Sequence, residues 1–412
     1  MCVVQNDSLI ERDPGRRKIA KLLRRATLQV NSDLINEYSK ISYSDAVKKL
    51  MEAEEGTISP LDTDDIGEVV GWWIQQMGGS TSGLHEKMTW FWHSLLTTHR
   101  NDANGTFFVR KQLELLRTHA LGNYRELLHE FVKDGALLAY LDGDGSQASN
   151  PNENLSRELM ELFTLGVGNY SEDDVRSAAR AMAGWQVDRE ENEVNFNNRR
   201  AFKAPLIFRG VQDSWDTEKI VDHLCDDKQT AAYVSRQIWF YLGGGWLNEK
   251  DSKDLGDWWH GKDLEIKPLV EKALLEMENS PDYQRPRTGI DFYFAYASVT
   301  NFDITESNYR LRQLDQMPYE PPNVAGWAKD DRWLLSGSML VRGQLAFQID
   351  FENINNWESI DSDSALNLCG IYAVSKQTLN ALKLVDNSDL TDEDKAKARL
   401  MTALASPEFQ LL

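Results

Sequence analysis

The chain has little of what disulfide frameworks, membrane spans and signal peptides require. Its 412 residues include three cysteines, Cys2, Cys225 and Cys369, which lie far apart and are odd in number. This pattern fits neither a disulfide framework nor a paired-cysteine zinc site, and it leaves the cellular compartment open. No apolar run of about 18 residues exists, so we expect no transmembrane helix. The segment MCVVQNDSLIERD lacks the apolar core of a signal peptide.

Positive charge is scarce relative to negative charge. Lys and Arg number 45 against 65 Asp and Glu, which gives a formal net charge of −20. Because such a surface repels phosphate backbones, we expect no nucleic-acid partner. The sequence contains no GxSxG, P-loop or glycine-rich cofactor motif, and HEKMT at 85–89 lacks the second histidine of the HExxH zinc motif. We therefore expect no cofactor and keep a divalent metal as the alternative.

Tryptophan, by contrast, is abundant, with 13 residues in the chain. Adjacent pairs such as Trp72 and Trp73 cannot share one face of a helix, since neighbouring residues point in different directions. One member of each pair must therefore lie on another surface, in a groove or at an interface. Core packing and stacking on carbohydrate both use tryptophan, and the sequence leaves both interpretations open.

Helical periodicity runs through most of the chain. Apolar residues recur at helical spacing, and Ser, Thr or Asp often precedes the periodic stretch, as Thr391 does before three acids. The pattern predicts a mainly α-helical, multi-helix globular fold with a short β-hairpin or an ordered loop near 186–212. We expect an N-terminal helical part over 1–145 and a second over 146–412, packed as one continuous unit.

The segment 152–185, NENLSRELMELFTLGVGNYSEDDVRSAARAMAGW, predicts two helices joined by a glycine-containing turn. At about 100° per residue, one face of the first helix carries four polar residues: Asn154, Arg157, Glu158 and Glu161. The two carboxylates could ligate a metal, because residues at i and i+3 lie side by side. They could also form ion pairs with Arg157 or with an arginine of the next helix, such as Arg180.

A histidine within an aromatic stretch is a further candidate. His93 lies in FWHSLLTTH, where it could be a hydrogen-bonded core residue or could serve in metal binding or acid–base chemistry. Because the opposite side of the 152–163 helix is apolar, we expect Glu158 and Glu161 to face inward, toward His93 or an arginine.

Several of these segments together resemble the bacterial domain-of-unknown-function 1800 family. The similarity covers nearly the whole chain, and the long central motif is the most specific part. The matching segments are LLRRATL (22–28), EKMTWFWH (86–93), the central motif (152–185), PPNVAGW (321–327) and ASPEFQ (405–410).

The resemblance implies a setting for the protein and a class of partner. Many members of the family carry export signals, which points to the cell envelope or secretion, although this chain shows no signal peptide. Some members are encoded beside a second uncharacterised family related to sulfatases and phosphatases. A protein partner, such as a sulfatase-like neighbour protein, is therefore expected.

This chain departs from the family pattern where polar ligands would stand. The family usually continues as FWHxHF, whereas the second histidine position here is Leu95. The family's downstream His-Asp pair aligns with Ala201 and Phe202. The chain is thus a divergent member that keeps His93 and the two glutamates, and we expect no tightly bound metal, since catalytic divalent ions usually need three or more protein ligands.

Two functions follow from this pattern. The favoured one is a non-catalytic binding or assembly component that has lost family site residues, with Asn154, Arg180, Asn323 and Trp327 as candidate binding residues. The alternative is a metal-assisted hydrolase or transferase of the cell envelope. Its candidate catalytic residues are His93, Glu158, Glu161 and Arg157, the first three also being candidate metal ligands.

The PPNVAGW segment carries a structural prediction. Pro321 and Pro322 stiffen the approach, Gly326 allows a tight backbone, and Trp327 offers a large apolar surface. We expect this loop to be ordered and to pack against the 152–185 helix pair.

Overall fold

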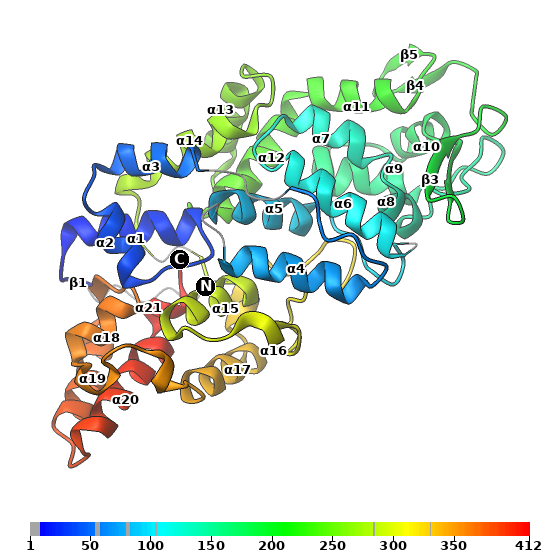
Figure 1. Cartoon of the computed structure of the whole chain (residues 1–412). Helices are drawn as coiled ribbons and strands as arrows, with labels where there is room; N and C mark the ends of the chain where they lie inside the picture. Colours follow the sequence, from blue (N-terminus) through cyan, green and yellow to red (C-terminus); the bar gives the residue numbers. More distant parts are fainter. Residues whose placement is uncertain (1–8, 54–57, 80–82, 104, 283–284, 330) are drawn as a thin grey trace.

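The computed structural model describes residues 9–53, 58–79, 83–103, 105–282, 285–329 and 331–412. Across these residues the chain is 59% helical, and the strands form only small two-stranded sheets. The predicted mainly α-helical fold is confirmed. Figure 1 shows an elongated arrangement with β4 and β5 at one end and α19 and α20 at the other. Among the described helices none combines the length and apolar character needed to cross a membrane.

The helices are α1 Pro14–Ala26, α2 Ser32–Tyr38, α3 Tyr43–Met51, α4 Ile66–Gly79, α5 Gly83–Leu95, α6 Thr106–Thr118, α7 Tyr124–Phe131, α8 Gly135–Tyr140, α9 Asn154–Glu158, α10 Glu172–Ala181, α11 Thr217–Asp226, α12 Lys228–Tyr241, α13 Glu249–His260, α14 Ile266–Glu276, α15 Gly289–Thr300, α16 Ser307–Gln313, α17 Ser336–Phe347, α18 Ser362–Leu368, α19 Lys376–Asp386, α20 Asp392–Ala405 and α21 Pro407–Gln410. A π-helix, η1 Leu159–Thr164, continues α9. The strands are β1 Ile10–Glu11, β2 Trp185–Asp188, β3 Glu193–Phe196, β4 Leu206–Phe208, β5 Val211–Asp213 and β6 Ala373–Val374.

Side-chain caps explain where many of these helices begin. The predicted Thr391 cap is confirmed, because its side chain accepts a hydrogen bond from the N–H of Asp394 at the start of α20. Ser171 and Asp174 form a reciprocal capping box at the start of α10. Each cap satisfies backbone N–H groups that the first turn of a helix leaves without a partner.

The β structure lies where the helical period is lost. The predicted hairpin or loop near 186–212 is two antiparallel hairpins: β2 pairs with β3 and β4 pairs with β5. A third pair joins β1 to β6, with Ile10 opposite Val374. This pair brings the first described residues next to the C-terminal part of the chain, and strands of two residues are too short to leave a period in the sequence.

A single hydrophobic cluster includes residues from α1 through α21. The tandem tryptophans divide as predicted: Trp73 and Trp259 are fully buried, whereas Trp72 and Trp258 are half-buried against the cluster. The division into 1–145 and 146–412 stays a prediction.

Candidate functional site

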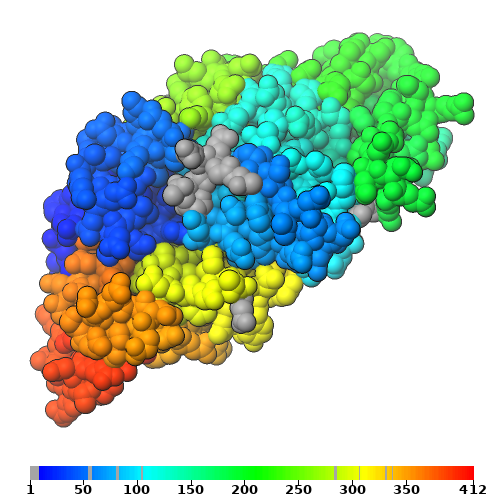
Figure 2. Space-filling view, viewed as in Figure 1, coloured from blue at the N-terminus to red at the C-terminus, as the bar shows by residue number. Residues whose placement is uncertain are grey.

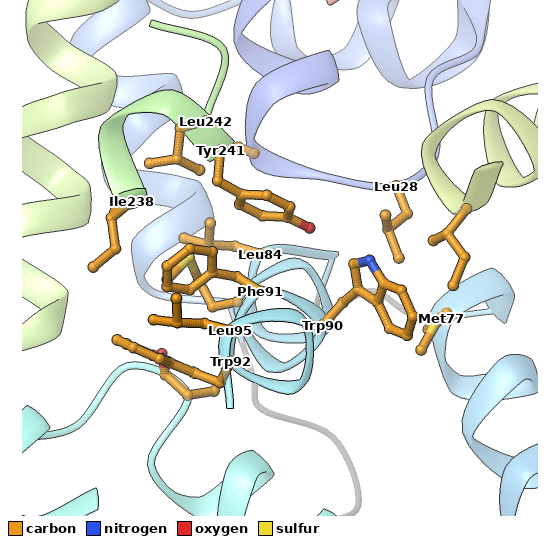
Figure 3. Packing of buried hydrophobic residues seen from close by; sticks show 14 of the residues in the cluster. Leu28, Met77, Leu84, Trp90, Phe91, Trp92, Leu95, Ile238, Tyr241 and Leu242 are labelled. Atoms are coloured by element: carbon orange, nitrogen blue, oxygen red, sulfur yellow. The ribbon is translucent and has the colours of Figure 1, made fainter. Parts of the chain in front are cut away.

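Helix α5, which carries the FWH motif, runs through the interior of the molecule. Residues 84–93 are all buried. Figure 3 shows α5 nearly end-on: Trp90 points toward Met77 of α4, while Phe91 and Leu95 extend on the opposite side, where Ile238 and Tyr241 of α12 lie. A helix enclosed on every side is a core helix rather than an amphipathic surface helix, so its polar residues must find partners inside the protein.

The charged residues of α5 have such partners. The Glu86 carboxylate accepts hydrogen bonds from Arg117 Nη1 at 2.6 and 2.7 Å and from Trp73 Nε1 at 3.1 Å. The Lys87 ammonium pairs with the carboxylate of Asp291. Burying a charge is costly unless an opposite charge and hydrogen bonds compensate it. These pairs therefore tie α5 to α6 and α15.

His93 lies at the centre of an aromatic enclosure. Its Nε2 accepts a hydrogen bond from the backbone N–H of Tyr319 at 3.0 Å. The rings of Trp73, Trp90, Tyr319 and Trp327 surround it, with centroids 4.3 to 5.5 Å from the imidazole centroid. The side chain is fully buried. The enclosure joins α4, α5 and the segment after α16.

This environment determines what the His93 imidazole can do. Burial lowers its pKa to about 3, so the ring is neutral at physiological pH. Because Nε2 accepts the Tyr319 hydrogen bond, we assign the proton to Nδ1, which has no hydrogen-bond partner in the structure. A metal ligand needs a lone pair, and the only one on the ring is already engaged with the backbone.

The PPNVAGW loop packs against α5 and the residues that follow it. The hydroxyl of Thr97 donates to the Val324 carbonyl at 2.7 Å. At Gly326, φ is +76° and a Cβ atom would lie 2.7 Å from the Ser94 carbonyl oxygen, so only glycine fits. The Trp327 ring lies 5.2 Å from that of Trp90.

The predicted order of the loop and burial of Trp327 are correct, but the predicted docking on the 152–185 helix pair is wrong. The Trp327 side chain is buried against Trp90 and His93 of α5. Asn323 is exposed, and its side chain stabilises the turn of the loop: its Oδ1 accepts a hydrogen bond from the N–H of Ala325 at 2.9 Å.

The polar face of the family motif lies at the surface. Arg157 donates to both oxygens of Glu172, at 2.7 and 2.8 Å, and to Glu153 at 3.1 Å. These carboxylates are 60% and 39% exposed. Arg157 therefore joins α9 to α10 through solvent-accessible ion pairs.

The two glutamates of the motif behave differently from each other. Tyr170 donates its hydroxyl hydrogen to Glu161 Oε2. Burial, and then the nearby charge of Glu161, raises the pKa of Glu158. Both side chains are half-buried, and no contact in the described chain joins either to His93.

The expected inward orientation of both glutamates toward His93 or an arginine therefore stays a prediction, and the partner that the structure shows for Glu161 is the Tyr170 hydroxyl. The π-helix η1 begins at Leu159 and lengthens the turn there, so the assumed spacing of about 100° per residue does not hold across it. The face covered by other elements is the apolar one.

Asn154 and Arg180, the remaining predicted binding residues, are both exposed. Asn154 Nδ2 donates to Asp142 Oδ2 at 3.1 Å. Within the described ranges no hydrogen bond, ion pair or ring contact joins these two residues to Asn323 or Trp327. The structure does not bring the four together, and their binding role stays a prediction.

The positions aligned with family ligands lie in apolar surroundings. Leu95 is buried beside α12, and Phe202 packs against the hydrophobic cluster. In the part of the chain that the structure describes, no group of three or more His, Cys, Asp or Glu side chains is placed to hold one metal ion.

One exposed feature has no counterpart in the sequence predictions. Leu335, Leu340 and Phe347 are 61%, 64% and 70% exposed. Leu340 and Phe347 are seven residues apart on α17, which places them on one face about two turns apart. We call these three residues the α17 stripe. The sequence shows their spacing but not which face of the helix is left uncovered.

A mainly helical protein with an aromatic-enclosed histidine in its core is the class that fold and site define. The chain belongs to the family described as "Protein of unknown function (DUF1800)", whose model matches residues 21–411. The resemblance inferred from the motifs is thereby confirmed. No curated protein and no solved structure matches the chain.

Proposed function

We propose that the protein is a non-catalytic binding component that docks an amphipathic helix of a basic partner protein on the α17 stripe. The observation that carries this proposal is the exposure of Leu340 and Phe347 on one face of α17, together with that of Leu335, the residue before the helix begins. Exposed apolar residues that gather in this way are typical of interaction surfaces. Burying such a side chain contributes about 1.5–3 kcal/mol, so covering all three would support a specific complex.

The opposite face of α17 is firmly held, which preforms the stripe. Arg342 Nη2 donates to the Arg287 carbonyl at 2.8 Å, and its Nη1 donates to Gln410 Oε1 at 3.2 Å. Leu345 and Ala346 are fully buried. A partner would therefore meet a rigid surface, and little conformational entropy would be lost on binding.

An open groove continues the stripe at the N-terminal end of α17. It has a volume of about 600 Å³, and Trp333, Leu335 and Gly337 are among its lining residues. Such a groove can receive an anchoring side chain of the partner, the usual centre of binding energy. Beyond the other end of α17, Arg310 Nη2 donates to Gln348 Oε1 at 2.9 Å, and the neighbouring Tyr309 is 64% exposed. Figure 1 places α16 and α17 side by side along the lower margin of the molecule, and Figure 2 shows the same yellow to orange region at the surface.

The net charge favours a basic partner protein over a second copy of this chain as the ligand of the α17 stripe. Two copies of a chain with charge −20 repel each other at long range, whereas a basic partner is attracted. An apolar stripe at helical spacing suits a helix that lays its own apolar face along it. The sulfatase-like neighbour protein suggested by the family resemblance is the first natural candidate.

His93 supports a binding role over the alternative of a metal-assisted hydrolase or transferase. Its Nε2 lone pair accepts the Tyr319 N–H, and its burial leaves no room for a substrate. Glu158 and Glu161 belong to a different surface. His93 therefore lies in a different local environment from the two glutamates proposed for the same metal site.

The test uses a synthetic basic amphipathic helix made of Leu and Lys as the probe. Its affinity for the full chain is measured by fluorescence anisotropy, beside a scrambled peptide of the same composition. The variant Leu340→Gln/Phe347→Gln removes the stripe. The matched control is Leu384→Gln, which changes a leucine on α19 that is 75% exposed.

We expect the amphipathic peptide to bind the unaltered chain and the control alike, and the double variant about tenfold or more weakly. The scrambled peptide should bind all three equally weakly. Equal binding of the amphipathic peptide to all three proteins would overturn the proposal. Analytical sedimentation gives the oligomeric state of each protein. If the unaltered chain is a dimer and the double variant is a monomer, the partner is a second copy of the chain, and the choice of a basic partner is overturned.

A further inference from the structure

A small chamber lies between α5, α12 and the residues that follow the PPNVAGW loop. Its volume is about 40 Å³, enough for about three water molecules. Leu95 and Tyr241, which are labelled in Figure 3, form part of its apolar wall. Gln316, Trp327 and Ala328 line both this inner chamber and the open groove beside α17, so the two spaces are neighbours.

Two cationic side chains and no acid are found among the described residues that line the inner chamber. The cations are Arg285 and Lys329. Arg285 Nη2 pairs with Asp291 Oδ2 at 2.8 Å, but the same carboxylate also pairs with Lys87 and accepts from Thr288. One negative charge is therefore shared by two buried cations before Lys329 is counted. The described residues that line the inner chamber are therefore positively charged, in a protein of net charge −20.

Several hydrogen-bond donors around the inner chamber have no good acceptor. Trp327 Nε1 and Arg285 Nε are buried and have no hydrogen-bond partner in the structure. Lys329 Nζ donates to Gln237 Oε1 over a long distance, 3.4 Å. Burial lowers the pKa of Lys329 to about 8. Buried donors are nearly always satisfied in folded proteins, so an acceptor is missing from this set.

The volume and the lining of the inner chamber determine which hydrogen-bond acceptor fits it. Formate has three heavy atoms and acetate four, which matches a space for about three waters. Phosphate is larger and carries more charge than these walls can compensate. Leucine and aromatic side chains suit the carbon end of a carboxylate, and the donors suit its oxygens.

We propose that the inner chamber binds a small monocarboxylate of the size of formate or acetate. Its oxygens accept hydrogen bonds from Lys329 and Trp327 Nε1, and its carbon end packs on Leu95. The same chemistry fits the carboxylate end of a larger molecule that enters past Trp327 from the groove. This site is independent of the docking proposed for the α17 stripe.

The experiment titrates the full chain with ¹³C-labelled acetate near neutral pH and at constant ionic strength, followed by NMR line broadening. Lys329→Gln removes one cation, and Trp327→Phe removes the Nε1 donor while keeping a ring. Lys203→Gln is the matched control, because Lys203 is exposed and does not line the chamber. Chloride, phosphate and benzoate are tested as competitors.

We expect saturable acetate binding that weakens about tenfold in Lys329→Gln and severalfold in Trp327→Phe. Binding should be unchanged in Lys203→Gln and in Leu340→Gln/Phe347→Gln, so a failure of the docking proposal would leave this result intact. Benzoate that competes at least as well as acetate would support a larger carboxylate, and weaker competition would support a small free one.

Acetate binding that is absent, or equal in Lys329→Gln and the unaltered chain, would overturn the assignment. Phosphate or chloride that displaces acetate at lower concentration would overturn the choice of a carboxylate. If Lys329→Gln loses its circular dichroism signal, the Trp327→Phe result decides.

Discussion

Helix α5 and the α9–η1 segment both carry polar residues of the family motif, yet the fold gives them different roles. On α5, Glu86, Lys87 and His93 lie in a dry interior, and each has a defined partner. On α9–η1, Arg157 and the two glutamates are partly exposed, and the ion pairs reach solvent. Polar side chains thus hold the core together on α5, whereas on α9–η1 they form contacts at the surface.

The difference shows that the contribution of a polar side chain to stability depends on how completely other elements cover it. A buried ion pair that loses one member leaves a charge without compensation, whereas an exposed pair is replaced by water at little cost. Substitutions on α5 should therefore lower stability more than substitutions on α9–η1.

Arg117→Ala should destabilise the protein by about 3–5 kcal/mol, because it leaves the Glu86 carboxylate buried without its partner. Both side chains are at most 1% exposed. The free energy of unfolding from urea titration measures the loss. A loss below about 1 kcal/mol would break the comparison, since α5 would then behave like a surface helix.

The pH dependence of stability should differ between residues of α5 and residues of α9–η1. Burial lowers the pKa of His93 to about 3 from 6.5. The unfolded chain therefore binds more protons between these pH values, and stability falls as pH drops through that window, by about 5 kcal/mol in full. His93→Gln, which keeps an acceptor for the Tyr319 N–H, should flatten this dependence. Glu158→Gln at the half-exposed face should leave it nearly unchanged.

This pH experiment needs Asp134→Asn as its background. Burial raises the pKa of Asp134 to about 7 from 3.8, so the folded chain holds a proton that the unfolded chain releases. Its contribution therefore falls as pH rises from 3.8 to 7, opposite in sign to that of His93. A slope that does not change with His93→Gln in this background would contradict the dry environment described for the histidine.

Tyr170→Phe should cost about 1 kcal/mol, because Glu161 loses a hydrogen bond in a half-buried position. Tyr309→Phe is the matched control: its hydroxyl accepts from Gln313 at an exposed site. Thermal unfolding of both variants gives the difference. A larger loss than that of Arg117→Ala would mean that the α9–η1 face is covered more completely than α5.

Arg157→Ala should have the smallest effect, below about 1 kcal/mol, and the effect should shrink further as salt is added. Its partner Glu172 is 60% exposed. Urea titrations at low and high ionic strength provide the measurement. An effect that is large and independent of salt would show that this ion pair is shielded from solvent.

Part of this structure could be predicted from local patterns. The helical class, the β region near 186–212 and the Thr391 cap depend on interactions between residues close in the chain, so their signals are visible in the sequence. The pairing of Ile10 with Val374 joins distant segments and leaves no such signal. The docking of Trp327 on Trp90 likewise depends on which aromatic surface the fold places nearby.

The candidate site shows the same limit. The aromatic stretch around His93 makes this residue a candidate from the sequence alone, but its partner, the backbone N–H of Tyr319, is 226 residues away. Spacing alone predicts that Glu158 and Glu161 share a face, whereas the extent to which that face is covered depends on other elements. The π-helix at Leu159 further changed the assumed spacing.

By itself the sequence determined the helical class, the helix starts and the family, since these depend on periodicity, capping and motifs that are local. The tertiary structure decided which polar residues are buried, which helix face of α17 stays open and which cations surround the chamber beside Leu95. The physical reason is that burial and electrostatic compensation come from residues far apart in the chain, and only the packed fold brings them into contact.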